Sequence, residues 1–237
     1  MKTTTHSLKV SIQLLRLAPT LIVVALTALC TANARANTIV FNTLGPGDTY
    51  SQINGYQISG NNAATGIDTE EAAQFTAGAS GFLATVDLGL GYAVSPGLPV
   101  SAYLYGDASG SPDNANQTLL GSGTPTAEFG TTNNSIVSIA VAGNVPVTMG
   151  SLYWLVLKPA NPNAFDFWNL SLPPITGNVA ESMDHSPWDV GSGGVLPAFR
   201  ITAQSPVGVP DSASTWTLLL LGLTAVLGLR RFVRQPV

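Results

Sequence analysis

Two apolar segments, one near each end, constrain this 237-residue chain more than any other feature of its sequence. The first, residues 17–29, follows three basic residues, and the second, residues 215–229, precedes a pair of arginines. Positively charged flanks stay on the cytoplasmic side of a bacterial-type plasma membrane. The stretch between the two segments must then lie on the outer side, which predicts an exported protein.

The first 36 residues have the layout of a secretory signal peptide, with a basic start and an apolar centre. Ala34 and Ala36 supply small residues at the two positions that signal peptidase reads, which predicts a cut before Asn37. The apolar run has 13 residues, or about 20 Å of helix. A hydrocarbon core is ~30 Å thick, so cleavage is favoured over the alternative of an uncleaved anchor.

Cys30 is the only cysteine, and it lies in the segment expected to be removed. A lipoprotein cysteine is the alternative, but the bulky Leu29 directly before it is wrong for that processing. The mature domain would then have no disulfide framework and no cysteine metal site.

The middle of the chain, residues 37–205, is acidic, with twelve acidic side chains against two basic ones, Lys158 and Arg200. An acidic surface repels phosphate backbones, so we expect no nucleic-acid partner. The alternative to a functional role for this negative charge is that it only keeps an exported domain soluble. Charged residues make up only 9% of the chain, whereas it holds 24 Gly and 16 Pro, a mixture typical of a turn-rich β protein.

Short β-type runs separated by turn clusters fill residues 37–205. Apolar and polar residues alternate over 82–90, the period of a strand with one buried face. Residues 136–142 and 152–157 are apolar at nearly every position, which predicts central strands covered on both faces. Residues 68–74 indicate one short helix. We predict an all-β domain, a single antiparallel β-sandwich of jelly-roll-like form.

Residues 206–237 form a separate unit, a linker followed by the second apolar run. That run has 15 residues, or about 22 Å of helix, and flanking residues with the snorkelling stems of Arg230 and Arg231 extend it toward ~30 Å. We predict a C-terminal transmembrane helix stopped by these two arginines. A buried core helix is the alternative, but the run is apolar on every face.

The tail resembles a known sorting signal. Val209, Pro210, Asp211 and Ser212, followed by the apolar run and terminal arginines, resemble the VPDSG-type variant of the PEP-CTERM signals, with Ala213 where that family has glycine. The resemblance implies recognition by an exosortase-like enzyme and membrane anchorage before processing. It then implies cell-surface attachment or secretion, often alongside exopolysaccharide. A permanent tail anchor without processing is the alternative.

The domain between the two ends resembles the choice-of-anchor domains that are found joined to such tails. The similar segments are residues 73–76, 103–107, 153–157 and 197–201. Those domains have no assigned activity. The resemblance therefore implies an extracytoplasmic domain and names no ligand.

No group of residues in the sequence indicates catalysis. Asp184, His185 and Ser186 are consecutive, and a triad needs groups that converge from separated positions, so a surface loop is the favoured interpretation. No spacing singles out a carboxylate pair of the glycosidase type. We predict a non-enzymatic surface or matrix-associated protein without a cofactor, and a hydrolase is the most distant alternative.

Oxygen-bearing side chains alternate between Asp107 and Asp113, as they do in calcium loops. The acidic closing residue is missing and Pro112 interrupts the pattern. A plain polar turn is therefore favoured, and we predict no metal site.

Aromatic residues give the domain its other candidate function. Three tryptophans, Trp154, Trp168 and Trp188, could form a sugar-stacking platform together with Tyr103 and Tyr105. Trp154 lies within an apolar strand and is expected in the core, whereas Trp168 and Trp188 lie beside predicted loops. The alternative function is therefore a carbohydrate-binding module acting on exopolysaccharide, with Trp168 and Trp188 as its candidate stacking residues.

Overall fold

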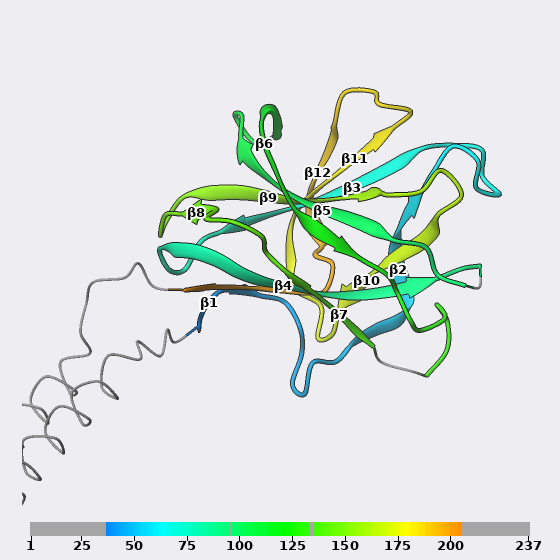
Figure 1. Cartoon of the computed structure of the whole chain (residues 1–237), viewed down its shortest axis with the longest axis horizontal. Coiled ribbons are helices and arrows are strands. Elements are labelled where there is room, and N and C mark those ends of the chain that lie inside the picture. Colours follow the sequence, from blue (N-terminus) through cyan, green and yellow to red (C-terminus); the bar gives the residue numbers. More distant parts are fainter. Residues whose placement is uncertain (1–36, 95, 133–134, 205–237) are drawn as a thin grey trace, which may run out of the picture. The chain divides into compact units, whose positions relative to one another are not determined.

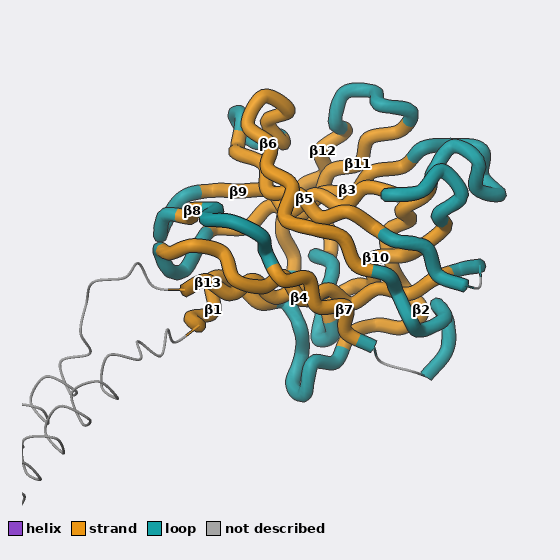
Figure 2. Tube along the Cα trace, viewed as in Figure 1, coloured by secondary structure: helices purple, strands orange, loops and turns teal. Residues whose placement is uncertain are grey.

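The computed structural model describes residues 37–94, 96–132 and 135–204, and within these ranges it contains strands and turns but no helix (Figures 1 and 2). The strands are β1 (Asn37–Asn42), β2 (Tyr50–Ser59), β3 (Thr69–Thr76), β4 (Gly81–Tyr92), β5 (Val100–Asp107), β6 (Pro112–Gly123), β7 (Ile136–Ala140), β8 (Pro146–Val147), β9 (Leu152–Pro159), β10 (Phe165–Ser171), β11 (Thr176–Met183), β12 (Asp189–Val195) and β13 (Phe199–Gln204). The predicted signal peptide and tail, with their helices, lie outside the described residues.

The strands form one continuous sheet that folds over itself into two layers. Its path runs β1-β13-β4-β10-β2-β3-β9-β5-β6, with β7 and β8 beside β4, β11 beside β3, and β12 beside β11. All pairings between these strands are antiparallel, among them β4 with β13 and β3 with β9. Figure 1 shows β4 and β7 in one layer and β3, β5 and β9 in the other. The predicted all-β, antiparallel, sandwich-like fold is confirmed.

The main core lies between the two layers. It combines Val86, Leu88 and Leu90 of β4 with Leu155 and Leu157 of β9, all of them buried. The alternation over 82–90 therefore predicted the inward face of β4 correctly from Val86 onward. At the start of the strand it was wrong, because Leu83 lies in the core and Phe82 and Ala84 are half-buried. Burying a large aliphatic side chain contributes about 1.5–3 kcal/mol, so this cluster supplies much of the free energy that holds the layers together.

Two strand predictions for apolar runs had opposite outcomes. β9 is covered on both faces, as predicted, because Trp154 and Val156 are buried on the side away from Leu155 and Leu157. β7 is not, because it pairs only with β4 and leaves its other edge unpaired by any described strand. Its burial alternates, with Val137 and Ile139 inside and Ser138 outside, so an edge strand stands where a central one was predicted.

The predicted short helix at residues 68–74 is wrong. Thr69–Thr76 form β3, which pairs with β9 on one side and β11 on the other. Glu70, Glu71 and the two following alanines favour a helix in isolation. Pairing on both edges and burial of Phe75 outweigh that local preference.

A second, smaller cluster covers the outer face of the β3–β9–β5 layer. It comprises Ala72, Tyr105, Trp154, Val156 and Ala180, with Tyr103 and Trp188 packed against it. An outer sheet face would ordinarily meet solvent. Here it carries large aromatic residues, and it is where the candidate site lies.

The first and last strands lie side by side. β1 pairs with β13, and the register places Asn37 opposite Gln204, so the described chain begins and ends at the same edge (Figure 2). β13 is also paired with β4 on its other side. Both directions of chain continuation therefore leave from one place on the domain.

Candidate functional site

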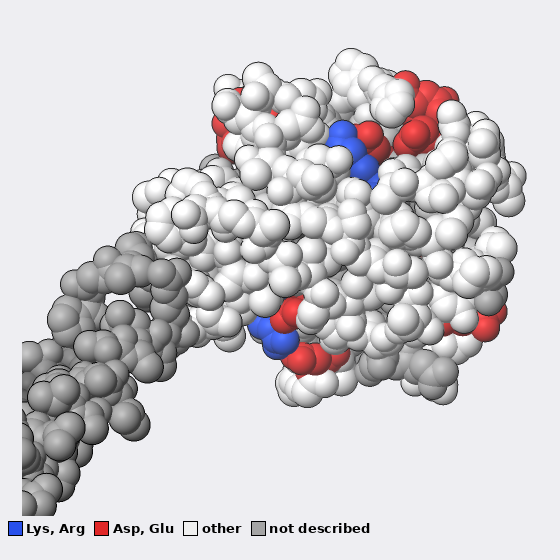
Figure 3. Space-filling model, viewed as in Figure 1, with Lys and Arg blue, Asp and Glu red and all other residues white. Residues whose placement is uncertain are grey.

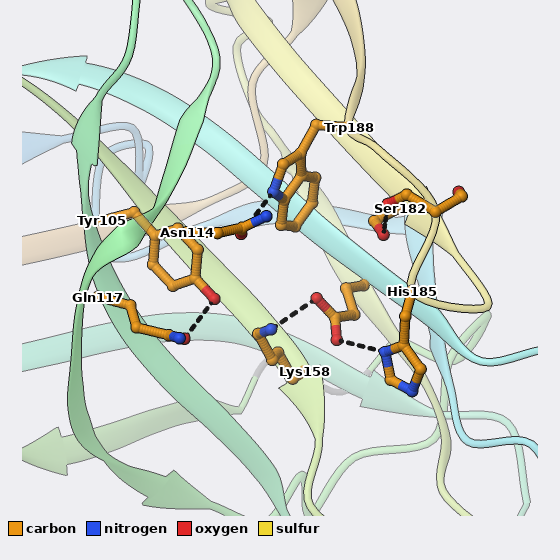
Figure 4. Close-up of a pocket in the computed structure, with 9 residues that line it drawn as sticks. Tyr105, Asn114, Gln117, Lys158, Ser182, His185 and Trp188 are labelled. Carbon is orange, nitrogen blue, oxygen red and sulfur yellow. Dashed lines mark hydrogen bonds and ion pairs between the residues drawn. The ribbon is translucent and has the colours of Figure 1, made fainter.

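An open pocket of about 170 Å³ lies on the outer face of the β3–β9–β5 layer (Figure 4). Strands β3, β5, β6, β9 and β11 and the loop before β12 each contribute lining side chains. These segments are far apart in sequence. The pairings of β3 with β9 and β11, and of β5 with β6 and β9, bring them together.

Two aromatic residues form the apolar part of the pocket. The rings of Tyr105 and Trp188 meet edge to face, with centroids 6.3 Å apart and planes at 87°, an arrangement that ring quadrupoles favour. Tyr105 is buried, whereas Trp188 is half-buried. Trp188 is therefore the ring that a ligand can reach, and the buried Tyr105 ring packs against it.

Side-chain amides hold both aromatic residues in place. Trp188 donates from Nε1 to Oδ1 of Asn114 at 3.1 Å, and the Tyr105 hydroxyl donates to Oε1 of Gln117 at 2.7 Å (Figure 4). Both amides come from β6, the edge strand next to β5. Each amide keeps its NH₂ group, which can donate to a ligand oxygen.

An ion pair forms the charged wall of the pocket. Lys158 Nζ lies 2.8 Å from Oε2 of Glu70, and 5.5 and 5.6 Å from the ring centroids of Tyr105 and Tyr103. Burial lowers the pKa of Lys158, but hydrogen bonds with Glu70 and Tyr105 and their charges outweigh it, so the net pKa is raised. Lys158 is therefore charged at physiological pH, and Glu70 compensates it.

A strained turn places His185 at the rim. Asp184 and His185 both have positive φ, 49° and 59°, a conformation that Asp and His adopt more readily than most residues. Asp184 and Asp68 exchange two hydrogen bonds, Asp184 N to Asp68 O at 2.8 Å and Asp68 N to Asp184 Oδ1 at 3.0 Å. These bonds hold the turn against the start of β3.

The contacts of the His185 ring are with carboxylates. Nδ1 lies 3.6 Å from Oε1 of Glu70, and Nε2 lies 3.9 Å from Oδ2 of Asp68, while the side chain is 75% exposed. The hydroxyl of Ser186 instead accepts from Met183 N at 3.3 Å. Asp184, His185 and Ser186 thus lie in a surface turn and do not converge as a triad.

The structure separates the two predicted stacking residues. Trp188 lies in the pocket, but Trp168 is 0% exposed, donates from Nε1 to Ala198 O at 3.2 Å and packs against Phe199. The prediction that Trp168 could stack on a ligand is wrong. Its strand, β10, lies between β2 and β4 in the sheet, and the ring points into the main core.

Asp107, one of the two weak calcium candidates, is occupied by protein donors. Oδ1 accepts from Gln74 Nε2 at 2.7 Å and Trp154 Nε1 at 2.8 Å, and Oδ2 accepts from Gly110 N at 3.0 Å. Burial raises its pKa, but the hydrogen bonds from Trp154, Gly110 and Gln74 outweigh this and lower it. Asp107 is an ionised acceptor that orders the start of the β5–β6 hairpin.

Asp113, the other calcium candidate, caps the beginning of β6. It accepts from Ala115 N at 2.9 Å and from Asn116 Nδ2 at 2.5 Å. Across the part of the chain that the structure describes, no three residues of the His, Cys, Asp and Glu types gather as metal ligands. Asp107 and Asp113 therefore act as turn acceptors in this structure.

Comparison with known proteins decides the nature of the tail. Residues 208–231 match the family model of the VPDSG-CTERM motif. The chain carries a VPDSG-CTERM sorting signal. This PEP-CTERM-type signal implies export to the cell surface.

The residues of the VPDSG-CTERM signal lie outside those that the structure describes. This applies to Val209, Pro210, Asp211 and Ser212, to Arg230 and Arg231, and also to Ala34 and Ala36 of the predicted signal peptide. Asn37, the residue predicted to follow the cut, is the first residue of β1. Over 37–204, with its two short gaps, no helix is long and apolar enough to cross a membrane.

One solved structure similar to this chain contains the cysteine protease and lectin-like domains of Cwp84, a surface layer associated protein of Clostridium difficile. The TM-score is 0.41 at 14% identity, over 58% of this chain and 32% of that one. The chain thus spans about a third of the protein it resembles. No curated protein matches the chain, and the similarity to choice-of-anchor domains stays a prediction.

Proposed function

We propose that this chain is a non-enzymatic, saccharide-binding protein of the cell surface, delivered by its VPDSG-CTERM signal. The observation that carries the binding proposal is the half-buried ring of Trp188, fixed against Tyr105 in a pocket whose other walls are polar. The ligand would be a sugar of the exopolysaccharide that accompanies such surface proteins.

The pocket chemistry supports a sugar ligand. A sugar ring has an apolar C–H face and a rim of hydroxyls, and the Trp188 ring offers the first partner while the NH₂ groups of Asn114 and Gln117 offer the second. A cavity of about 150 Å³ is enough to hold one benzene molecule. The pocket, at about 170 Å³, has room for one ring of similar size.

The carboxylates favour binding over hydrolysis. Glycosidases place two carboxyl groups about 5–9.5 Å apart across the scissile bond, one of them with a raised pKa. In the described residues the two acids whose pKa is raised furthest, Glu71 and Asp166, are absent from the pocket lining, and the lining acid, Glu70, is paired with Lys158. This supports a site that holds a ligand without cleaving it.

A glycan array with the full-length protein tests the binding proposal. Trp188→Ala should lower affinity for the bound glycan at least about tenfold, or about 1.4 kcal/mol, because it removes the accessible ring. The matched control is Phe129→Ala, which removes another half-buried aromatic residue, stacked on Phe167 at 4.0 Å, and should leave binding unchanged. Equal losses in both variants, or no specific glycan at all, would contradict the proposal.

The processing of the tail needs its own experiment. We propose that signal peptidase cuts before Asn37, and that an exosortase-like enzyme then cuts near Val209–Ser212 after Arg230 and Arg231 have stopped transfer. Proline cannot continue a helix, so the motif would present an extended segment at the membrane face. Intact-mass measurement on protein from the native cell should give a chain from Asn37 to about residue 210. A chain that still ends at Val237 would indicate a permanent anchor instead.

A further inference from the structure

We infer that the pocket selects neutral sugars that carry a vicinal diol and rejects acidic sugars such as uronic acids. The reason lies in the Lys158–Glu70 ion pair, which offers a donor and an acceptor side by side but no uncompensated positive charge. This inference rests on the proposed function and names the ligand class of the same site.

The cation of the pocket is compensated from several sides. Glu70 holds Lys158 Nζ at 2.8 Å, and the ring centroids of Tyr103 and Tyr105 lie 5.6 and 5.5 Å from the same nitrogen. The Glu70 side chain is only 8% exposed, on a strand paired along both edges. A ligand carboxylate would therefore have to compete with a fixed protein carboxylate for the same ammonium group.

The charges around the pocket also oppose an anion. Asp68 and Glu70 face His185, and Asp184 lies at the turn beside them. Arg200, the other base of residues 37–205, is bound to Asp48 and Asp87 and does not line the pocket. Like charges repel by about 1 kcal/mol at 4 Å even in water, and by more at lower dielectric.

The same ion pair suits two adjacent hydroxyls. An ammonium group has three N–H donors, of which Glu70 and the Tyr105 hydroxyl each take one here, and a carboxylate accepts several hydrogen bonds. One ligand hydroxyl can accept from Lys158 while its neighbour donates to Glu70. Neither bond requires the ion pair to open, and Trp188 lines the same pocket for the apolar face of the ring.

The test compares two probes on the full-length protein, a neutral glucose oligomer and the glucuronic acid oligomer of the same linkage. Wild type should bind the neutral oligomer at least about tenfold more tightly, the factor that 1.4 kcal/mol corresponds to. Glu70→Gln uncovers the charge of Lys158, so affinity for the acidic oligomer should rise about tenfold. The double variant Glu70→Gln with Lys158→Gln should lose that gain.

The control separates the local charge from the net charge of the protein. Glu181→Gln removes one negative charge from β11, at a residue that does not line the pocket, and should leave the preference unchanged. An equal gain in acidic binding in this variant would overturn the inference. If Glu70→Gln does not fold, Lys158→Gln is the test. It should lower the affinity for the neutral oligomer. A fall in the affinity for the acidic oligomer would show that Lys158 was already available to anions.

The outcomes distinguish the inference from the proposed function. Wild-type protein that binds the acidic oligomer more tightly would overturn the inference alone. Equal affinity for both oligomers would do the same. If neither probe nor any neutral glycan binds, the saccharide-binding function itself is wrong, and the inference with it.

Discussion

Glu70 and Glu71 are neighbours on β3, yet they occupy opposite environments because successive side chains of a strand point to opposite faces. Glu70 reaches the outer pocket and pairs with Lys158. Glu71 shares the inner face with Ala73 and Phe75, and Glu181 lies opposite it on β11. Burial, and then the charge of Glu181, raise the pKa of Glu71 to about 9. On the inner face of the sheet, burial therefore favours the protonated form of Glu71 at neutral pH.

The same contrast recurs between Asp87 and Asp166. Asp87 accepts from Arg200 Nε at 2.9 Å and also from Ser138. Asp166 is 0% exposed, neither of its oxygens has a hydrogen-bond partner, and burial raises its pKa to about 7. In Figure 3 blue occurs only in small patches beside red on a mostly white surface, so cationic side chains are few on this face.

Removing the cation of Asp87 should have the largest effect on stability. Arg200→Met leaves a nearly buried carboxylate without its partner, and breaking such a pair costs about 3–5 kcal/mol. Asp48, which Arg200 also binds at 2.6 Å, is more exposed and should contribute little. Urea unfolding at pH 7 measures the change, and a loss below about 1 kcal/mol would contradict the role given to this pair.

Glu71→Gln should act in the opposite direction and stabilise the fold. The folded-state pKa of about 9 lies above the ordinary value of 4.5, so the contribution of Glu71 to stability is fully present below pH 4.5 and is lost as pH rises toward 9. The variant removes this slope and should gain about 2–3 kcal/mol at pH 7. Glu70→Gln on the same strand is the control and should not stabilise. A gain that does not depend on pH would contradict the explanation.

Asp166→Asn should give a smaller gain over a lower pH range. Its folded-state pKa of about 7 against an ordinary 3.8 means that the contribution of Asp166 to stability is lost between about pH 4 and 7 and changes no further above that. The amide cannot ionise, but it still lacks partners, so the net gain at pH 8 should be only about 2 kcal/mol. Thermal unfolding of the variant and wild type at pH 4 and at pH 8 measures the gain at each pH. The same gain at both pH values would disprove the raised pKa of Asp166.

The sequence predicted the fold class because strand periodicity is local. The apolar run Leu152–Leu157 and the alternation over 82–90 are enough to identify β9 and β4. β3 was missed because its helix-favouring Glu and Ala residues are overruled by pairing with β9 and β11, which no local pattern contains.

The candidate site was only partly predictable for the same reason. Trp188 was predicted as a stacking residue and lies in the pocket. The same prediction for Trp168 was wrong, because a position beside a loop in the sequence does not tell whether a ring points into the core or out of it. Glu70 was missed because only the pairings of β3 with β9 and β11 bring it beside Lys158 and His185. Tyr105 was a named candidate, and His185 was placed in a surface loop. Lys158 carried a usable signal as one of only two bases in residues 37–205.

The pairing of β1 with β13 determines how the domain bears a pull from its tail. β13 lies between β1 and β4, and the chain leaves it at Gln204 toward the sorting signal. Tension along that exit acts parallel to the strand, whereas ladder hydrogen bonds run across it. The two ladders are therefore loaded in shear, and many bonds must fail together instead of opening one by one. A pull on the tail along β13 is therefore shared by its two ladders, one with β1 and one with β4.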